Sequence, residues 1–227
     1  KQLPKERQTI MFSATMPKKI RTLAEAILDN PATVDIAISK PAEGIVQEAY
    51  ICYESQKLGI IQSLFKDSMP EKVIVFSSSK QKVREVTRSL KQMHLLAEEI
   101  HSDLEQSKRD EALLSFKNGK VNILVATDIV SRGIDIENID MVINFDVPSD
   151  AEDYIHRIGR TARAQKTGRG ITFVSEKEQN KFHRIELFLD KEIDKCCLPE
   201  YLGEVPEYSP KGSFGGAKQG WRRKRKF

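Results

Sequence analysis

The chain has 227 residues, of which 39% are hydrophobic and 31% charged, and its formal net charge is +4. This length and composition predict a soluble globular protein of one or two domains and exclude a disordered one. No window approaches the ~18 consecutive apolar residues of a membrane span, so we expect no membrane partner. The opening residues, KQLPKERQ, contain neither a signal peptide nor an initiating Met, so we expect a fragment.

The chain contains three cysteines, Cys52, Cys196 and Cys197. They form no CxxC pair and match no histidine at the spacing of a zinc site. This usage argues against a disulfide scaffold or a structural zinc site and is typical of a reducing compartment. We therefore predict buried or incidental thiols and a cytoplasmic protein.

The first predicted elements lie ahead of a candidate linker. Residues 9–12 predict a short buried strand, and residues 20–28 predict an amphipathic helix that ends before a proline. The segment 38–45 has no periodicity and contains Pro41 and Gly44. A change of domain is expected there.

Beyond this segment, apolar strands alternate with amphipathic helices. The predicted strands are residues 46–53, 72–76, 95–100, 121–126, 141–145 and 170–174, and the predicted helices include 56–65, 79–93 and 106–116. Such alternation predicts an α/β fold in which helices cover both faces of a parallel β-sheet. Sheets of this kind bind ligands beyond the carboxyl ends of their strands, so the residues that follow each strand are candidate site residues.

Hydroxyl groups follow two of these strands. Ser77 follows one strand, and Thr127 follows another, with Arg132 and Gly133 soon after it. Hydroxyl and backbone N–H groups near helix N-termini suit phosphate oxygens, and a glycine beside an arginine allows close approach of a ligand. Ordinary N-capping explains the serines Ser77 to Ser79 better when they are taken alone. Asp135 could accept a hydrogen bond from a sugar hydroxyl or cap a turn.

Three arginines, Arg157, Arg160 and Arg163, recur at every third position of the octet HRIGRTAR. On a helix they would lie near one face, where like charges repel. The planar fork of arginine suits phosphate, and two arginines aimed at a transferring γ-phosphate act as arginine fingers. Pairing with nearby surface carboxylates is the alternative. Gln106 and Arg109, taken alone, are better explained as a solvated helix face.

Basic charge is concentrated at the end of the chain. Of the 37 basic residues, seven lie in residues 211–227, which hold no acidic residue, so residues 1–210 hold 30 basic against 33 acidic residues. Segregated charge of this kind predicts an extension that binds a polyanion. Prolines in residues 201–210 and the Gly- and Lys-rich composition after them predict a disordered tail.

Taken together, residues 7–189 resemble the DEAD-box RNA helicases, which are ATP-dependent members of helicase superfamily 2. Five segments are similar to motifs III, IV, IVa, V and VI, in that order: Ser13-Ala14-Thr15, residues 72–78, Gln106 with Arg109, residues 126–135 and residues 156–163. Any one of these short motifs could occur by chance. Their ordered set on alternating strands and helices identifies the family.

The resemblance implies two RecA-like domains that close around ATP and RNA and unwind RNA duplexes locally. We expect the end of the first domain in residues 1–39, a linker in 40–45, the complete C-terminal RecA-like domain in 46–200 and a basic tail in 201–227. The phosphate loop and the Asp-Glu-Ala-Asp metal site are absent from this sequence. ATP with Mg²⁺ would therefore be bound mainly by the N-terminal domain, and this half alone is expected to be inactive as an ATP hydrolase.

The resemblance also implies roles for single residues around the nucleotide. Arg160 and Arg163 would be arginine fingers, and His156 would link motif VI to the first domain. Gly133 and Asp135 would meet the ribose of ATP. Coupling between the domains would involve three further residues: Ser13, Thr15 and Arg157.

RNA would be contacted through its phosphate backbone. The positions that resemble RNA-backbone residues of the family are Ser77, Gln106, Arg109, Thr127 and Arg132. Phosphate contacts carry no base information, so sequence-independent binding is expected. In the tail, Trp221 could stack on an unpaired base beside a basic run. That run includes Arg222, Arg223, Lys224 and Arg225.

Two other interpretations stay open. One is a non-catalytic RNA-binding or annealing module, and the other is a DNA helicase of the same superfamily. Arg160, Arg163 and Asp135 favour the ATP-dependent helicase, because a binding module needs no groups directed at a γ-phosphate. The choice between RNA and DNA depends on contacts to the 2′-OH, which the sequence does not locate.

Overall fold

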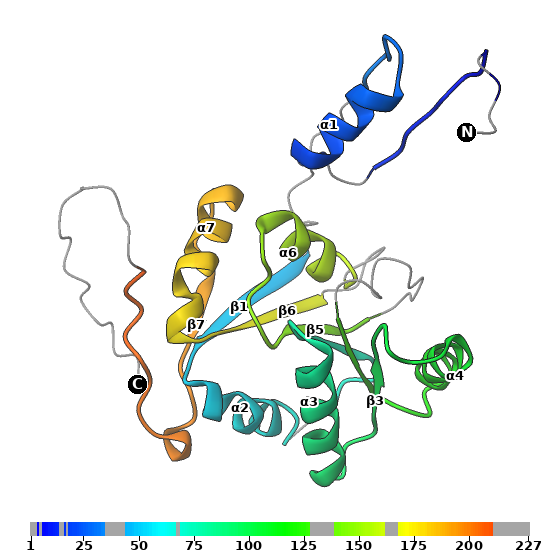
Figure 1. Ribbon diagram of the computed structural model, residues 1–227. Helices are drawn as coiled ribbons and strands as arrows, with labels where there is room; N and C mark the ends of the chain where they lie inside the picture. Colours follow the sequence, from blue (N-terminus) through cyan, green and yellow to red (C-terminus); the bar gives the residue numbers. More distant parts are fainter. Residues whose placement is uncertain are drawn as a thin grey trace, which may run out of the picture. The chain divides into compact units, whose positions relative to one another are not determined.

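The computed structural model divides the chain into two compact units, residues 1–40 and 41–227 (Figure 1). The structure describes residues 4, 6–13, 16, 18–34, 44–66, 69–127, 139–161 and 168–210. The first unit contains the helix α1 (Lys18–Ile27). Residues 9–12 form no strand, although the sequence predicts one. A strand needs a hydrogen-bonded neighbour, and the described part of this unit contains no strand for it to pair with.

The second unit is built on a seven-stranded parallel sheet with the order β3-β4-β2-β5-β6-β1-β7. The strands are β1 (Ile45–Ile51), β2 (Val73–Phe76), β3 (Ala97–Ile100), β4 (Ile123–Ala126), β5 (Met141–Asn144), β6 (Gly168–Val174) and β7 (Asp194–Cys196). The predicted parallel α/β fold is confirmed.

Helices cover both faces of this sheet, with α2 and α3 on one side and α6 and α7 on the other in Figure 1. The α-helices are α2 (Lys57–Leu64), α3 (Lys80–Gln92), α4 (Gln106–Lys117), α6 (Ala151–Ile158) and α7 (Gln179–Leu189), and the 3-10 helices are η1 (Glu54–Gln56), η2 (Glu176–Glu178) and η3 (Glu200–Leu202). Among the described helices, none is long and apolar enough to cross a bilayer.

The two sides of β2 pack into two different cores. Val73 and Val75 join the core beneath α2 and α3, whereas Ile74 and Phe76 join the core beneath α4. Because successive side chains of a strand point to opposite faces, a strand buried on both faces must be apolar throughout. This explains why the strand appears in the sequence as a continuous apolar run. All four of its residues are buried.

The strand β7 has no counterpart among the predicted strands. It pairs with β1 over only three residues, from Glu48 opposite Asp194 to Tyr50 opposite Cys196. As a short strand at the edge of the sheet, it has none of the apolar alternation that predicts longer strands. The sheet therefore extends one strand further than the sequence indicates.

Residues 201–210 pack against the domain, whereas we expected the tail to begin at residue 201. The side chain of Gln56 donates to the carbonyl oxygens of Leu202 and Glu204, both at 2.8 Å. The side chain of Gln179 donates to the carbonyl of Glu207 and accepts from the N–H of Ser209, again at 2.8 Å. Side-chain amides thus satisfy this backbone, which the apolar content of the segment does not reveal. The predicted basic residues after 210 lie outside the described residues.

Candidate functional site

The carboxyl ends of four neighbouring strands lie in a row, which we call the carboxyl edge of the sheet. In spatial order, β3, β4, β2 and β5 lie side by side, and all are parallel. Their chains continue into His101, Thr127, Ser77 and the pair Phe145-Asp146. Polar groups from segments far apart in the sequence therefore gather where parallel sheets hold their ligands.

Ser77 is completely buried behind this edge, and its hydroxyl donates to Asp146 Oδ2 at 2.9 Å. Its side chain therefore presents no surface to a phosphate group. The next two residues, Ser78 and Ser79, are exposed. Ser79 caps α3 by accepting from the N–H of Lys82 at 3.2 Å, so its own hydroxyl hydrogen remains available as a donor. The exposed hydroxyl groups of this loop are therefore those of Ser78 and Ser79.

The first turn of α4 lies against the loop that follows β3. Arg109 Nε donates to the carbonyl oxygen of His101 at 3.3 Å, and Arg109 NH1 donates to Gln106 Oε1, also at 3.3 Å. Gln106 in turn donates to Asp110 at 2.9 Å. The structure thus brings the predicted pair Gln106 and Arg109 together at the strand edge, with Gln106 exposed and Arg109 partly exposed.

Two buried polar atoms at the same edge, His101 Nε2 and Thr127 Oγ1, make no hydrogen bond in the described structure. His101 Nδ1 accepts from the N–H of Asp103 at 3.3 Å, which assigns the ring proton to Nε2. The carboxylate of Glu99 lies 3.7 Å from Nε2, beyond hydrogen-bond distance. Unsatisfied buried polar groups are few in folded proteins. The hydroxyl of Thr127 is thus buried and not presented to solvent.

Two arginines of the octet HRIGRTAR, Arg157 and Arg160, occupy different environments. Arg157, in the last turn of α6, is buried and donates to Asn144 Oδ1 at 3.1 Å and to the carbonyl of Asp146 at 3.2 Å. Its guanidinium also lies over the ring of Phe76, 5.2 Å from the centroid. Arg160 follows the end of α6 and is only partly buried. Arg157 therefore fastens α6 to the sheet and does not share one exposed face with Arg160.

Known proteins resemble this chain in sequence and in fold. Residues 56–165 match the model of the helicase conserved C-terminal domain. The DEAD-box ATP-dependent RNA helicase CshA of Geobacillus kaustophilus is 42% identical over 198 residues, which cover 87% of this chain and 42% of that protein. The solved C-terminal domain of the DEAD-box protein Dbp5 is 30% identical with a TM-score of 0.61, over 67% of this chain and 90% of that one. The chain belongs to the DEAD-box RNA helicase family.

The family resemblance expected from the motifs is confirmed for the C-terminal helicase domain. Saccharomyces cerevisiae Dbp5 bound to RNA and ADP BeF3 matches with a TM-score of 0.75 and 29% identity, over 86% of this chain and 52% of that one. The RecA-like fold is shared with these solved DEAD-box structures. The chain spans only about two fifths of the length of the curated DEAD-box relatives, at 42% and 40% for two CshA proteins.

Several predicted site residues, in the motifs and in the basic tail, lie outside the described residues. They are Thr15, Arg132, Gly133, Asp135, Arg163, Trp221, Arg222, Arg223, Lys224 and Arg225. Within the described residues, Ser13 is exposed in the first unit, and His156 is partly exposed on α6. The motif residues that the structure brings to one edge are thus those of motifs IV and IVa, with Thr127 of motif V.

Sequence reasoning missed a network of charged residues behind motif IV. Lys57 is fully buried, and its ammonium group lies 2.8 Å from Glu54 and 3.3 Å from both Asp146 and Glu178. Lys82 lies 2.5 Å from Asp146 and from Glu54. A signal was present, because Asp146 follows a predicted strand directly. The two lysines lie in helices, and only the packing of α2 and α3 onto the sheet brings them to it.

Four members of this network, Glu54, Lys82, Asp146 and Glu178, line a cavity of about 550 Å³. Side chains that line it include Tyr53, Ser78, Lys82, Asp146, Arg157 and Lys181. They come from the segments that follow β1, β2, β5 and β6, so the cavity continues the row of strand ends beyond β5.

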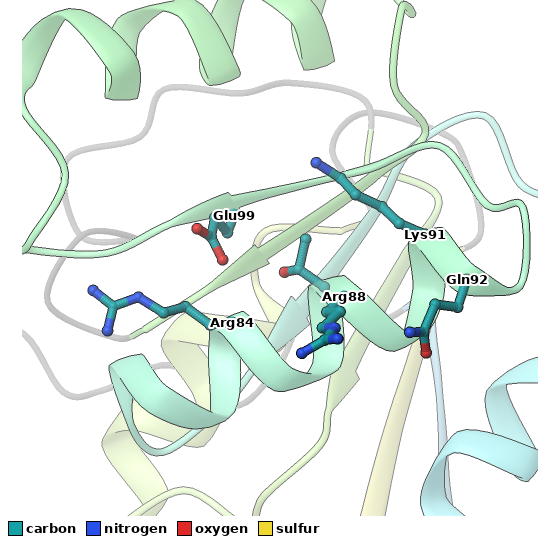
Figure 2. A pocket seen from close by; sticks show the side chains of 6 residues that line it. Arg84, Arg88, Lys91, Gln92 and Glu99 are labelled. Atoms are coloured by element: carbon teal, nitrogen blue, oxygen red, sulfur yellow. The ribbon is translucent and has the colours of Figure 1, made fainter.

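A separate open groove of about 570 Å³ runs beside α3 and is shown in Figure 2. Its lining includes Arg84, Arg88, Lys91, Gln92 and Glu99, with Arg84 and Arg88 on successive turns of the helix. Two of its cations are already paired at its border, Arg84 with Asp103 at 2.9 Å and Lys91 with Glu98 at 3.1 Å. With Glu99 across the groove, its charges nearly balance, so it lacks the excess positive potential that attracts a polyanion.

Proposed function

We propose that the chain is the C-terminal half of an ATP-dependent RNA helicase that unwinds duplexes locally. In this proposal it closes on an N-terminal RecA-like domain, supplies arginine fingers to ATP and forms half of the RNA groove. The observation that carries the proposal is the contact of Arg109 with both Gln106 and the His101 carbonyl, beside the strand ends. The activity named for CshA, an ATP-dependent RNA helicase, supports it.

The RNA surface in this proposal consists of Ser78, Ser79, Gln106 and Arg109. The exposed hydroxyl, amide and guanidinium groups can donate to phosphate oxygens, and the first turn of α3 adds its N–H groups. No base-reading arrangement is needed for such contacts, so binding is expected to be independent of sequence. Because the hydroxyl of Ser77 donates to Asp146, the phosphate contact predicted for Ser77 is assigned to its exposed neighbours Ser78 and Ser79.

The ATP surface depends on the residues at and after the end of α6. Arg160 would direct its guanidinium at the γ-phosphate, together with Arg163, while Gly133 and Asp135 meet the ribose and His156 contacts the first domain. A guanidinium supplied there stabilises charge that develops in the transition state. Arg160 is partly exposed, whereas Arg157 is buried, and a partly exposed position supports this role.

The described carboxylate cluster of this half does not fit a Mg²⁺ ion. Among the described residues, the carboxylates of Glu54, Asp146 and Glu178 come within 4.8 Å of one another. The ammonium groups of Lys57 and Lys82 lie among them, at 2.5 to 3.3 Å, and already supply the positive charge. In the proposed function, Mg²⁺ and most of the ATP would therefore be held by the N-terminal domain.

Residues 1–39 would be the end of that N-terminal domain, carrying Ser13 and Thr15 of motif III. Its apolar side chains support this assignment, since Ile10, Phe12 and Val34 are exposed by 65%, 91% and 85%. Large exposed apolar side chains in a short segment indicate a surface that a larger domain covers. Residues 40–45 would then be the linker between the two domains.

A pair of arginine variants in the full-length protein tests this proposal. Arg109→Ala should weaken binding of an unstructured single-stranded RNA about tenfold, because it removes a charged hydrogen-bond donor from the proposed RNA surface. Arg88→Ala is the matched control, since it removes the same charge from the exposed face of α3. Fluorescence anisotropy at fixed salt measures both affinities.

Equal affinities for the two variants would contradict the proposed RNA surface. The same titration with a DNA strand of identical sequence distinguishes an RNA helicase from a DNA helicase of the superfamily. If Arg109→Ala weakens RNA binding while the wild-type full-length protein hydrolyses no ATP, the non-catalytic RNA-binding or annealing module is the correct alternative.

A further inference from the structure

Asp146 is bound by four donors from three segments of the domain. Its Oδ2 accepts from the Ser77 hydroxyl at 2.9 Å and from the Ser78 N–H at 2.8 Å. Its Oδ1 accepts from Lys57 Nζ at 3.3 Å and from Lys82 Nζ at 2.5 Å. The residue is only 4% exposed, so the protein itself supplies these contacts in place of water. The carboxylate therefore joins the loop after β2 to α2 and α3.

This carboxylate stays ionised. Burial by itself would raise the pKa of Asp146, but Lys57, Lys82 and the Ser78 N–H together hold that pKa well below its usual range. Burial likewise disfavours the Lys57 ammonium, yet Glu178, Asp146 and Glu54 keep its pKa raised. At neutral pH the donors around Asp146 therefore surround a full negative charge.

The position of Asp146 is that of a bound anion. From β2 the chain passes to the outer strand β3, returns to β4 beside β2, and then crosses to β5 on the other side of β2. The strand order thus reverses between β2 and β5, which is where open parallel sheets bind their ligands. Helix N-termini at such points commonly hold phosphate through backbone N–H groups. Here α3 begins directly after Ser79, and the anion is a side chain of the same domain.

We infer that Asp146 is a positioning residue for RNA binding, an internal anion that fixes the Ser77–Ser79 loop so that Ser78 and Ser79 face the RNA backbone. The inference rests on the proposed function, because it assigns these serines to the RNA surface. Ser77 is the link in this arrangement: its buried hydroxyl binds Asp146, and the two residues after it are exposed. Asp146 itself touches no RNA.

The residue Glu186 on α7 provides a matched control. It is 5% exposed and accepts from a backbone N–H (Ile193, 3.0 Å), a hydroxyl (Tyr208, 2.7 Å) and a lysine, Lys195. The same kinds of donor therefore surround Asp146 and Glu186. Glu186 holds β7 and residue 208, not a strand-edge loop, so its loss should cost stability without a specific loss of RNA affinity.

The test compares Asp146→Ala with Glu186→Ala in the full-length protein. Asp146→Ala should weaken RNA binding about tenfold, since it leaves buried donors without an acceptor. About 0.1 M formate, compared with chloride of equal ionic strength, should restore much of that affinity by occupying the vacated anion position. Glu186→Ala should bind RNA within about twofold of wild type and show no response to formate beyond that of chloride.

Hydrogen exchange of the Ser78 N–H gives a measurement that needs no RNA. Asp146→Ala should speed this exchange, and formate should slow it again. Asp146→Asn, which keeps an oxygen for Ser78 but lacks the charge, should weaken RNA binding less and not respond to formate. This variant carries the test if the alanine variant does not fold.

Two results would overturn the inference. One is wild-type RNA affinity in Asp146→Ala, and the other is a loss that formate does not reverse and that Glu186→Ala reproduces. If the wild-type protein binds no RNA, the proposed function fails, while the effect of formate on Ser78 exchange still decides whether Asp146 holds the loop.

Discussion

Asp146 and Glu186 are two buried carboxylates with similar donors in two different regions of the domain. Asp146 holds the loop after β2 at the carboxyl edge of the sheet, where the exposed groups of Ser79, Gln106 and Arg109 lie. Glu186 holds β7 and Tyr208 against α7. A buried charged network perturbs pKa values in both regions, so its presence alone does not mark a functional site.

What separates the two regions is the segment that each carboxylate holds. Asp146 holds a loop that continues into the exposed Ser78 and Ser79, and the neighbouring strands β3 and β4 lead into two buried polar atoms without a hydrogen-bond partner in the described structure, His101 Nε2 and Thr127 Oγ1. Around Glu186, both carboxylate oxygens accept hydrogen bonds, and the side chain of Gln179 satisfies the backbone on both sides of Tyr208. The first region retains groups for a ligand, whereas the second uses its polar groups to hold the fold together.

The largest expected effect belongs to the residues that follow α6. In the full-length protein, Arg160→Ala or Arg163→Ala should reduce kcat for RNA-stimulated ATP hydrolysis on the order of 10³-fold, because charge in the transition state loses a partner. RNA affinity without nucleotide should barely change. Steady-state ATPase assays at saturating RNA measure the effect. Near-normal turnover in both variants would contradict the assignment of Arg160 and Arg163 as arginine fingers.

The next effect concerns the basic residues that follow the segment held by Glu186 and Gln179. If roughly four to six of the charges in 211–227 engage RNA phosphates, deleting these residues should reduce the slope of log K against log salt by about 3 to 4 units. Trp221 would add stacking on an unpaired base. Salt titrations of RNA binding with and without residues 211–227 measure the slope, and an unchanged slope would assign RNA binding to the carboxyl edge alone.

The smallest expected effect is a loss of stability in the second region. Burial and the neighbouring Glu186 raise the pKa of Tyr208, so its hydroxyl stays protonated and donates to Glu186 at 2.7 Å. Tyr208→Phe should lower the free energy of unfolding by about 1–2 kcal/mol, since it leaves a buried carboxylate short of one donor. ATPase activity should stay unchanged. Urea denaturation measures the difference, and a selective loss of activity at unchanged stability would reverse the roles of the two regions.

The parallel sheet could be predicted because its central strands are buried on both faces. Residues 73–76 and 123–126 must be apolar throughout, and this produces the runs from which strands are inferred. The three-residue edge strand β7 carries no such constraint. The low apolar content of residues 201–210 predicts a disordered tail. This prediction is wrong because two glutamine side chains, Gln56 and Gln179, hold the backbone of the segment.

At the candidate site, the sequence located the strand ends but not the orientation of their side chains. Motif resemblance marks Ser77, yet the burial of β2 continues through that residue, and only its neighbours are exposed. Asp146 follows a predicted strand, but its role depends on Lys57 and Lys82, which reach it from two helices. Contacts that join distant segments require the packed structure, since no local pattern encodes them.

The two outermost strands of the sheet, β3 and β7, carry charged side chains that protect this domain from aggregation. Each edge strand offers unpaired backbone groups to which another chain could add a strand. The four-residue strand β3 carries Glu98 and Glu99 at its centre, and Lys91 pairs with Glu98. At the opposite end, β7 carries Asp194 and Lys195, and Lys195 binds Glu186. An incoming strand at either edge would have to desolvate charged side chains, so growth of the sheet into intermolecular assemblies is disfavoured at both ends.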